Sequence, residues 1–227
     1  MIKAFSFDLF ETLVDIASIA KVFREVGVEL NDPRLFAEIW HTKQIQYALI
    51  MNATGRRFEP FSQLSSQALR FTTKIYHLKL NNKQINKVNE AKLNLDPFSD
   101  AKRGLEKLKG KGKGVVIAVL SNGETTKTEK LLSNVGLRQY FDYIVSAEDV
   151  KKYKPLPEPY LLASKRMDIP ISNICLISSN LWDIAGGQSA GMQTCWINRG
   201  EETKASDEID VDPDYTLDGI EKVIELL

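Results

Sequence analysis

The sequence has few cysteines, no excess charge of either sign and no long apolar run. Its 227 residues include only Cys175 and Cys195, both inside apolar runs. We expect them to be buried thiols in a reducing compartment rather than a disulfide framework. Lysine plus arginine and aspartate plus glutamate each number 30, which predicts no general attraction to nucleic acid or to a membrane surface. No apolar run approaches the roughly 18 residues that span a bilayer, and Asp8 comes before any signal-peptide core. These absences predict a cytoplasmic protein.

Short apolar runs that end in polar turns recur along the chain. They predict buried strands at residues 2–9, 115–120, 174–177 and 194–197, with weaker candidates at 143–145 and 215–217. Helical patterns lie at 101–109, 125–135, 158–167, 183–190 and 217–227. This alternation predicts an α/β fold, a Rossmann-like doubly wound parallel sheet that binds ligands at the carboxyl ends of its strands.

Residues 15–96 interrupt the alternation. They contain no convincing strand, and their periodicity predicts helices at 16–26, 33–51, 60–76 and 82–93. We therefore expect a catalytic core of residues 1–14 and 97–227 and an inserted helical cap of residues 15–96. The acidic stretch at 201–214 is expected to be a solvated loop.

Polar side chains gather where the predicted strands end. Asp8 follows the first strand, Ser121 and Asn122 follow the second, and Thr12 has a hydroxyl that can hold the Asp8 carboxylate. Lys154 follows the weaker strand candidate at 143–145. Taken alone, Asp8 fits a helix-capping residue and Lys154 a surface lysine. Together, a carboxylate, a cation and small donors at successive strand ends predict a site for an anionic substrate.

The order of these motifs resembles that of the haloacid dehalogenase superfamily. The motifs are FDLFETL at 7–13, LSNG at 120–123, YKP at 153–155 and Asp183. Further segments are similar to the L-2-haloacid dehalogenase (type II) branch, namely FS at 98–99, SSNLWD at 178–183, TCWINR at 194–199, and Trp40 with the KQ pair at 43–44. The resemblance covers essentially the whole chain and implies a Rossmann-like core with a helical cap.

The acids that magnesium phosphatases of this superfamily need are replaced here. Phe10 stands where they have a second aspartate, and Ser178–Ser179 stands where they have a Gly-Asp pair. Magnesium prefers oxygen ligands that include carboxylates, so we expect neither a metal nor an organic cofactor. A halide leaves as a stable anion and needs no general acid, which suits the apolar Phe10.

The resemblance implies hydrolysis of short L-2-haloalkanoic acids to 2-hydroxy acids, in which Asp8 attacks the halogen-bearing carbon and water hydrolyses the resulting ester. The resemblance implies that the backbone amides of Leu9 and Phe10, with Ser121, hold the substrate carboxylate, and that Asn122 contacts the halide. It also implies that Lys154 orients Asp8 and keeps it ionised, that Thr12, Ser178 and Tyr160 fix these groups, and that Asn180 and Asp183 position the water, with Asp183 as general base. An apolar wall is implied for Phe10, Ile45, Phe61 and Trp182. Asp183 also fits the N-cap of the helix that follows it.

Two positions depart from the branch. His41 stands where the family has a halide-binding arginine, and Glu11 stands where it has glycine. One expectation for His41 is an imidazolium whose pKa is raised by Asp8; the other, equally open, is a halide-binding position that has lost its function, with Lys43, Arg56 or Arg57 as substitutes. Two alternatives remain open: a hydrolase of another small anion, such as a weak phosphatase, and a small-carboxylate binder without turnover. Family members are often homodimers, and the resemblance implies the same option here.

Overall fold

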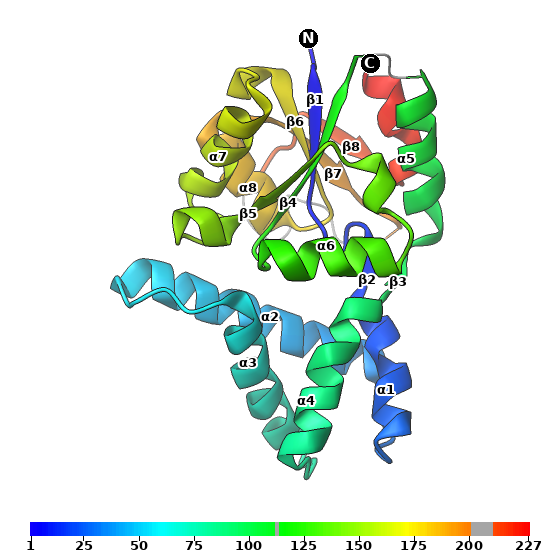
Figure 1. Ribbon diagram of the computed structural model, residues 1–227, viewed down its shortest axis with the longest axis vertical. Helices are drawn as coiled ribbons and strands as arrows, with labels where there is room; N and C mark the ends of the chain where they lie inside the picture. The colour runs from blue at the N-terminus through cyan, green and yellow to red at the C-terminus, as the bar shows by residue number, and fades with distance from the viewer. Residues whose placement is uncertain (112–113, 201–210) are drawn as a thin grey trace.

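The computed structural model describes residues 1–111, 114–200 and 211–227. Six parallel strands form one sheet in the order β5-β4-β1-β6-β7-β8 (Figure 1). Their bounds are Ala4–Phe7 (β1), Val116–Ser121 (β4), Tyr143–Ser146 (β5), Ile174–Ser178 (β6), Gln193–Ile197 (β7) and Tyr215–Leu217 (β8). The expected parallel α/β sheet is confirmed, and the chain enters it in the middle, at β1.

Helices cover both faces of the sheet, which explains why its strands are apolar runs rather than alternating ones. Phe5 and Phe7 of β1 pack in a cluster with side chains of α5, α6 and η7, whereas Ala4 packs on the opposite face with side chains of α7. These elements are α5 (Ser99–Lys111), α6 (Thr125–Asn134), α7 (Pro157–Met167), α8 (Leu181–Ala190) and the 3₁₀ segments η3 (Arg138–Tyr140), η4 (Ala147–Val150), η5 (Ile171–Asn173) and η7 (Ile220–Leu226). The chain termini lie at the far end from the strand carboxyl ends (Figure 1).

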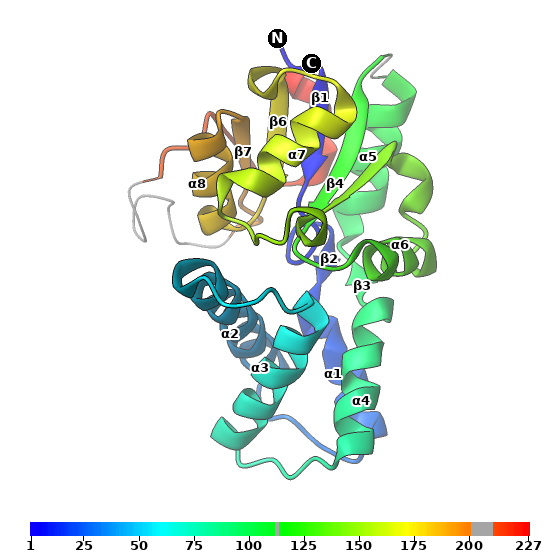
Figure 2. The ribbon, with the colours of Figure 1, turned by 60° about the vertical axis from the view of Figure 1, so that its left-hand side comes forward.

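Four helices lie beyond the carboxyl ends of the strands (Figures 1 and 2), and we call α1–α4 the cap helices. They are α1 (Ala20–Glu25), α2 (Pro33–Thr54), α3 (Phe61–Ile75) and α4 (Asn82–Ala91), with 3₁₀ segments η1 (Ile16–Ile19) and η2 (Lys92–Asn94). The chain enters and leaves them through a short antiparallel pair, β2 (Val14–Asp15) and β3 (Asp96–Pro97). The division into a core of 1–14 and 97–227 and a cap of 15–96 stays a prediction.

Two details differ from the sequence-based expectation. The β2–β3 pair was not expected, because two-residue strands carry no periodicity. The helix expected at 217–227 is instead the strand β8 followed by the 3₁₀ segment η7. Its buried residues Ile220 and Val223 are three apart, which matches the three-residue turn of a 3₁₀ helix. Most of the loop expected at 201–214 lies outside the described residues. In the described part of the chain, no helix is both long and apolar enough to cross a membrane.

Candidate active site

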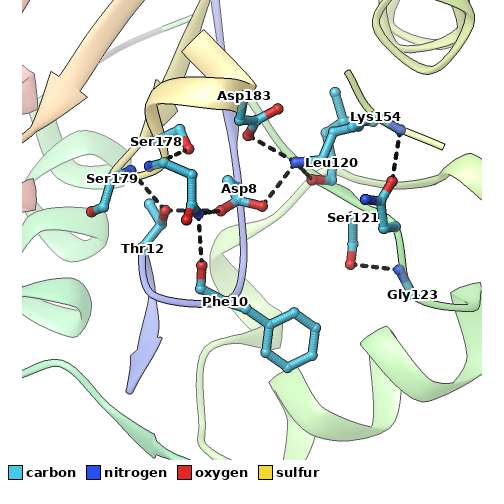
Figure 3. Close-up of polar contacts among 12 residues, drawn as sticks. Asp8, Phe10, Thr12, Leu120, Ser121, Gly123, Lys154, Ser178, Ser179 and Asp183 are labelled. Carbon is cyan, nitrogen blue, oxygen red and sulfur yellow. Dashed lines mark hydrogen bonds and ion pairs between the residues drawn. The ribbon is translucent and has the colours of Figure 1, made fainter. Parts of the chain in front are cut away.

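Three neighbouring strands bring the predicted polar residues together. Because β1 lies between β4 and β6, Asp8 after β1 is flanked by Ser121 at the end of β4 and Ser178 at the end of β6. The chain runs from β1 to β4 and β5 on one side of β1 and then returns to β6 on its other side, so this is the point where an open α/β sheet forms a crevice. Figure 3 shows the side chains converging there.

The Asp8 carboxylate is buried and each of its oxygens is engaged. Oδ1 lies 2.8 Å from Lys154 Nζ. Oδ2 accepts hydrogen bonds from Thr12 Oγ1 at 3.0 Å and from Asn180 Nδ2 at 2.8 Å (Figure 3). The Thr12 hydroxyl also accepts the backbone N–H of Ser179 at 3.0 Å. These contacts fix the carboxylate in one orientation.

Lys154 is a buried cation shared by two carboxylates. Its ammonium lies 2.8 Å from Asp8 and 2.8 Å from Asp183. A third contact, to Leu120 O at 3.1 Å, uses the remaining N–H. Burial alone would lower the pKa of Lys154, but the charges of Asp183 and Asp8 outweigh it and leave that pKa raised. Lys154 is therefore an ammonium across the neutral range.

Asp183 lies behind Lys154 in the first turn of α8, where Asn180 rather than Asp183 is the N-cap residue. Its second oxygen accepts a hydrogen bond from the Tyr160 hydroxyl at 2.6 Å. Burial raises the pKa of Asp183, and Lys154 partly offsets this. Gly186 permits the close approach of α8 to the turn that precedes α7, because a Cβ there would lie 2.7 Å from Pro155 Cβ. Both Asp183 oxygens have partners, and the general-base role stays a prediction.

A cavity of about 10 Å³ lies against the Asp8 carboxylate, which is room for about one water molecule. The residues that line it were all predicted from the sequence and come from both the strand ends and the cap helices. They are Asp8, Phe10, His41, Ile45, Phe61, Ser121, Asn122, Lys154, Asn180 and Trp182. Thr12, Tyr160, Ser178 and Asp183 support this lining from behind; Ser178 Oγ, for example, accepts the Asn180 N–H at 3.1 Å. Leu9 lines the adjoining cleft of about 540 Å³ between α3, α4 and α6.

Hydrogen bonds join the cap helices to the core next to residues that line this cavity. Asn52 of α2 exchanges two hydrogen bonds with the backbone of Tyr153, at 2.9 and 3.1 Å. At the start of α3, the Ser62 N–H donates to the Glu124 carboxylate at 3.3 Å. Both contacts join residues that are 62 or more positions apart in the sequence.

Several hydrogen-bond donors around the cavity are unused. Within the described residues, the backbone N–H groups of Leu9 and Phe10 have no hydrogen-bond partner. The same part of the chain offers no partner to Asn122 Nδ2 or to either ring nitrogen of His41. Asn122 is oriented by its other amide atom, Oδ1, which accepts the Lys154 N–H at 2.8 Å. Buried donors of this kind are normally satisfied, and Phe10, Asn122 and His41 all line the cavity beside Asp8, so their unused donors indicate an anionic ligand there.

The expected imidazolium at His41 is wrong. Burial first, and then the charge of Lys92, lower the pKa of His41 to about 4, and the opposing effect of Asp8 is smaller. His41 is therefore neutral at physiological pH and offers one N–H and one lone pair. The ring packs beside Phe10, with 6.1 Å between ring centroids.

The expected substitute cations are wrong as well. Lys43 Nζ lies over the Phe71 ring, 3.8 Å from its centroid, away from the cavity. Arg56 and Arg57 are exposed in the loop after α2. The cation near His41 is Lys92, which sequence reasoning missed. It follows Ile85 and Val88 at helical spacing on the buried face of α4 and η2, and a lysine at such a position was the available signal.

Lys92 lies among aromatic rings behind the cavity. Its ammonium is 4.9 Å from the Phe10 ring centroid and 4.8 Å from that of Trp40. It donates a hydrogen bond to Gln44 Oε1 at 2.7 Å. Burial lowers the pKa of Lys92 to about 7, with a smaller opposing effect from Glu124. Lys92 thus changes charge near neutral pH, whereas His41 does not.

Glu11 occupies the left-handed backbone region, with φ of 64°, where glycine is normally favoured. Its carboxylate accepts the Ile16 N–H at 3.0 Å. Burial, only partly offset by that hydrogen bond, raises the pKa of Glu11 to about 7. The Glu11 carboxyl group is therefore only partly charged at neutral pH.

The donor set does not suit a divalent metal. Lys154 Nζ lies within 2.8 Å of both Asp8 and Asp183, so a fixed cation takes the position between the two carboxylates. In residues 1–111, 114–200 and 211–227, no three histidine, cysteine, aspartate or glutamate side chains are grouped to hold a metal ion.

Comparison with known proteins supports one family. The family model described as haloacid dehalogenase-like hydrolase matches residues 2–191. An (S)-2-haloacid dehalogenase of Pseudomonas fluorescens is 35% identical over 93% of this chain and 90% of its own length. An (S)-2-haloacid dehalogenase of Pseudomonas putida is 33% identical over 95% of this chain and 92% of its own length.

Solved structures agree with this result. A dehalogenase solved with an intermediate complex matches with a TM-score of 0.88 and 28% identity over 100% of this chain and 97% of its own. The L-2-haloacid dehalogenase of Xanthobacter autotrophicus, at 23% identity, matches in fold with a TM-score of 0.88 over 100% of this chain and 98% of its own. The sequence-based family expectation is confirmed: this chain belongs to the haloacid dehalogenase-like hydrolases.

Proposed function

We propose that this protein hydrolyses short L-2-haloalkanoic acids to 2-hydroxy acids, without a metal or an organic cofactor. Asp8 attacks the carbon that bears the halogen from the side opposite the halogen; a carbon–oxygen bond forms and the halide leaves with the bonding electron pair. Attack from the rear inverts that carbon. Relatives that are named (S)-2-haloacid dehalogenases support this substrate class.

The unused donors define how the substrate is held. The free N–H groups of Leu9 and Phe10, with the Ser121 hydroxyl, bind the substrate carboxylate. Asn122 Nδ2 and the neutral His41 ring face the departing halide, and the aromatic and aliphatic wall surrounds the carbon chain. Donors that are already fixed before charge develops stabilise it without reorganisation. Because the His41 donor is neutral, it stabilises the halide less than an arginine would.

The second step is hydrolysis of the ester on Asp8. Water adds to the ester carbonyl of Asp8 as Asp183 takes one of its protons, and the alkoxide leaves and takes up that proton to give the 2-hydroxy acid. The Asp8 carboxylate is restored with one oxygen from water, and the second proton of the water goes to solvent. Asn180, which contacts Asp8 at 2.8 Å, positions that water, and the raised pKa of Asp183 suits a general base. A matching dehalogenase solved with an intermediate complex supports a covalent step.

One observation carries the proposal: a buried carboxylate, paired with an ammonium, faces a cavity rimmed by unpaired donors, with Phe10 where a phosphatase needs an acid. The test is a halide-release screen on both enantiomers of 2-chloropropionate and on chloro-, bromo- and fluoroacetate. Release from the L enantiomer with formation of D-lactate is expected. No release from any of these acids contradicts the proposal, and magnesium-dependent hydrolysis of p-nitrophenyl phosphate would favour a phosphatase.

The pH profile should show no effect of His41 between pH 6 and 9. A histidine whose pKa is lowered to about 4 gains its proton only when the pH falls toward that value, so its neutral form persists throughout this range. His41→Ala removes one neutral donor and should lower kcat about tenfold at every pH. Steady-state rates for L-2-chloropropionate across this range provide the measurement.

His77, the only other histidine in the chain, is the matched control, because it is exposed after α3. His77→Ala should leave rate and profile unchanged. A rate that falls near pH 7 in both wild type and His41→Ala assigns the titration to a group other than His41, and both Lys92 and Glu11 have a pKa of about 7. A fall that disappears only in His41→Ala contradicts a neutral His41.

Activity should survive EDTA. Since the Lys154 ammonium already occupies the position between the two carboxylates, chelation should change halide release by less than twofold. Rates after overnight dialysis against EDTA, with and without added magnesium, provide the measurement. A loss of more than tenfold that magnesium restores would favour the phosphatase.

A further inference from the structure

Arg199 joins the turns around the active site without lining the cavity at the nucleophile. It follows β7 directly, at the same end of the sheet as Asp8. Its Nε and Nη2 atoms form a bidentate pair with Asp100, both at 3.1 Å. The guanidinium also lies 4.0 Å from the Phe98 ring centroid. Asp100 and Phe98 belong to the segment by which the chain returns from the cap helices.

The remaining N–H groups of Arg199 reach the turn that follows Asp8. Nη1 donates to Glu11 O at 3.2 Å and Nη2 donates to Thr12 O at 2.8 Å. Nη1 also donates to Ser179 Oγ at 3.4 Å. The five donors of the guanidinium thus meet five acceptors, which only the planar fork of arginine can do.

This turn has to be held from outside, because its backbone is strained. Glu11 has φ of 64° without being glycine, and such a residue persists only where its surroundings fix it. The next residue, Thr12, orients Asp8 Oδ2. Any shift of the turn therefore moves the hydroxyl that aims the nucleophile.

We propose that Arg199 is a positioning residue: its guanidinium clamps the carbonyls of Glu11 and Thr12 and so holds the Thr12 hydroxyl on the Asp8 carboxylate. The inference rests on the proposed function, because it assigns Asp8 the attack on the substrate. Misplacement of a nucleophile by a fraction of an ångström affects the chemical step more than it affects substrate binding.

The test uses Arg199→Ala and Arg199→Lys with L-2-chloropropionate. Each variant should lower kcat about 100-fold and raise KM less than threefold. The lysine variant should fail like the alanine variant, because lysine keeps the positive charge but lacks the planar fork of donors. A cavity of about 550 Å³ adjoins Arg199 and Glu11, so free guanidinium can reach the space that Arg199→Ala opens. Guanidinium at tens of millimolar should raise the kcat of Arg199→Ala at least tenfold, whereas methylammonium should not.

Arg103→Ala is the control, since Arg103 also pairs with a carboxylate, Glu221, but on the exposed face of α5. Its kcat should equal that of the wild type. Arg199→Ala with kcat within threefold of the wild type, or a loss that guanidinium leaves unchanged, would overturn the proposal. If Arg199→Ala does not fold, Arg199→Lys and Asp100→Asn replace it in the test. Each should lower kcat much more than it raises KM.

Hydrogen exchange separates this inference from the proposed function, because it needs no substrate. The amides of Glu11, Leu13 and Val14 are bonded within the turn, at 2.9 to 3.1 Å. Arg199→Ala should speed their exchange at least tenfold and guanidinium should slow it again. Unchanged exchange would refute the clamp even if the enzyme is active. A wild type that releases no halide refutes the function alone, and exchange then decides the clamp.

Discussion

Replacing Asp8 by asparagine is expected to abolish halide release, by on the order of 10⁴-fold or more. The amide has the size of the carboxylate but lacks the charge that attacks carbon. The fold should persist, because Thr12 and Asn180 still surround the side chain. Halide release, with circular dichroism as the check on folding, provides the measurement. Asp218→Asn is the matched control, since Asp218 is exposed and bonded only to Lys222.

The covalent step has its own test in the wild-type protein. A single turnover in heavy-oxygen water should place label in the Asp8 carboxylate, because water attacks the ester carbonyl rather than the substrate carbon. Peptide mass analysis of residues near Asp8 detects it. Label in the hydroxy acid alone, with none in the protein, would mean that water attacks the substrate directly and Asp8 is a general base.

The second large effect is expected for Lys154→Met. This variant leaves the Asp8 and Asp183 carboxylates buried without their shared cation. Breaking a buried pair from one side typically lowers the free energy of unfolding by about 3–5 kcal/mol. Halide release should fall at least 10³-fold, because the nucleophile loses the contact that orients it.

The stability loss should depend on pH with a predictable sign. The pKa of Asp183 is already raised in the folded protein and must rise further without Lys154. A folded state that holds a proton longer than the unfolded state loses stability as pH rises through this interval. Lys154→Met should therefore lose less stability at pH 5 than at pH 8, as measured by urea unfolding at both values.

A second variant tests the cause of this loss. Adding Asp183→Asn removes one unpaired charge and should recover part of the stability at pH 8 but none of the activity. If Lys154→Met is equally stable at both pH values, Lys154 does not stabilise the buried carboxylates by its charge, and the electrostatic role assigned to it is wrong.

The fold and the strand-end residues were predictable because both follow from short-range pattern. An apolar run that stops at a polar turn places Asp8, Ser121 and Ser178 at one edge of the sheet, once the strands are parallel. The C-terminal segment was less predictable. The seven residues of η7 have the composition of an α-helix, but their buried side chains are spaced three residues apart.

The electrostatics of the site could not be predicted in the same way. The pKa of His41 depends on its burial and on Lys92, which is 51 positions away in the sequence. Arg199 depends on contacts with three other segments of the chain, none of them adjacent to it. Periodicity describes which face of an element is buried, but it does not describe which charges meet there.

The cavity of about 10 Å³ beside Asp8 has a kinetic consequence. Even 2-chloropropionate is larger than the single water molecule for which this cavity has room, so the lining must open to admit it. We expect the Asn52–Tyr153 and Ser62–Glu124 hydrogen bonds between the cap helices and the core to break in that opening. Substrate capture is then governed by the frequency of this opening, whereas carbon–halogen bond strength governs the later step. For reactive bromo acids the opening should become rate-limiting, so that kcat/KM becomes sensitive to solvent viscosity while that of the chloro acids does not.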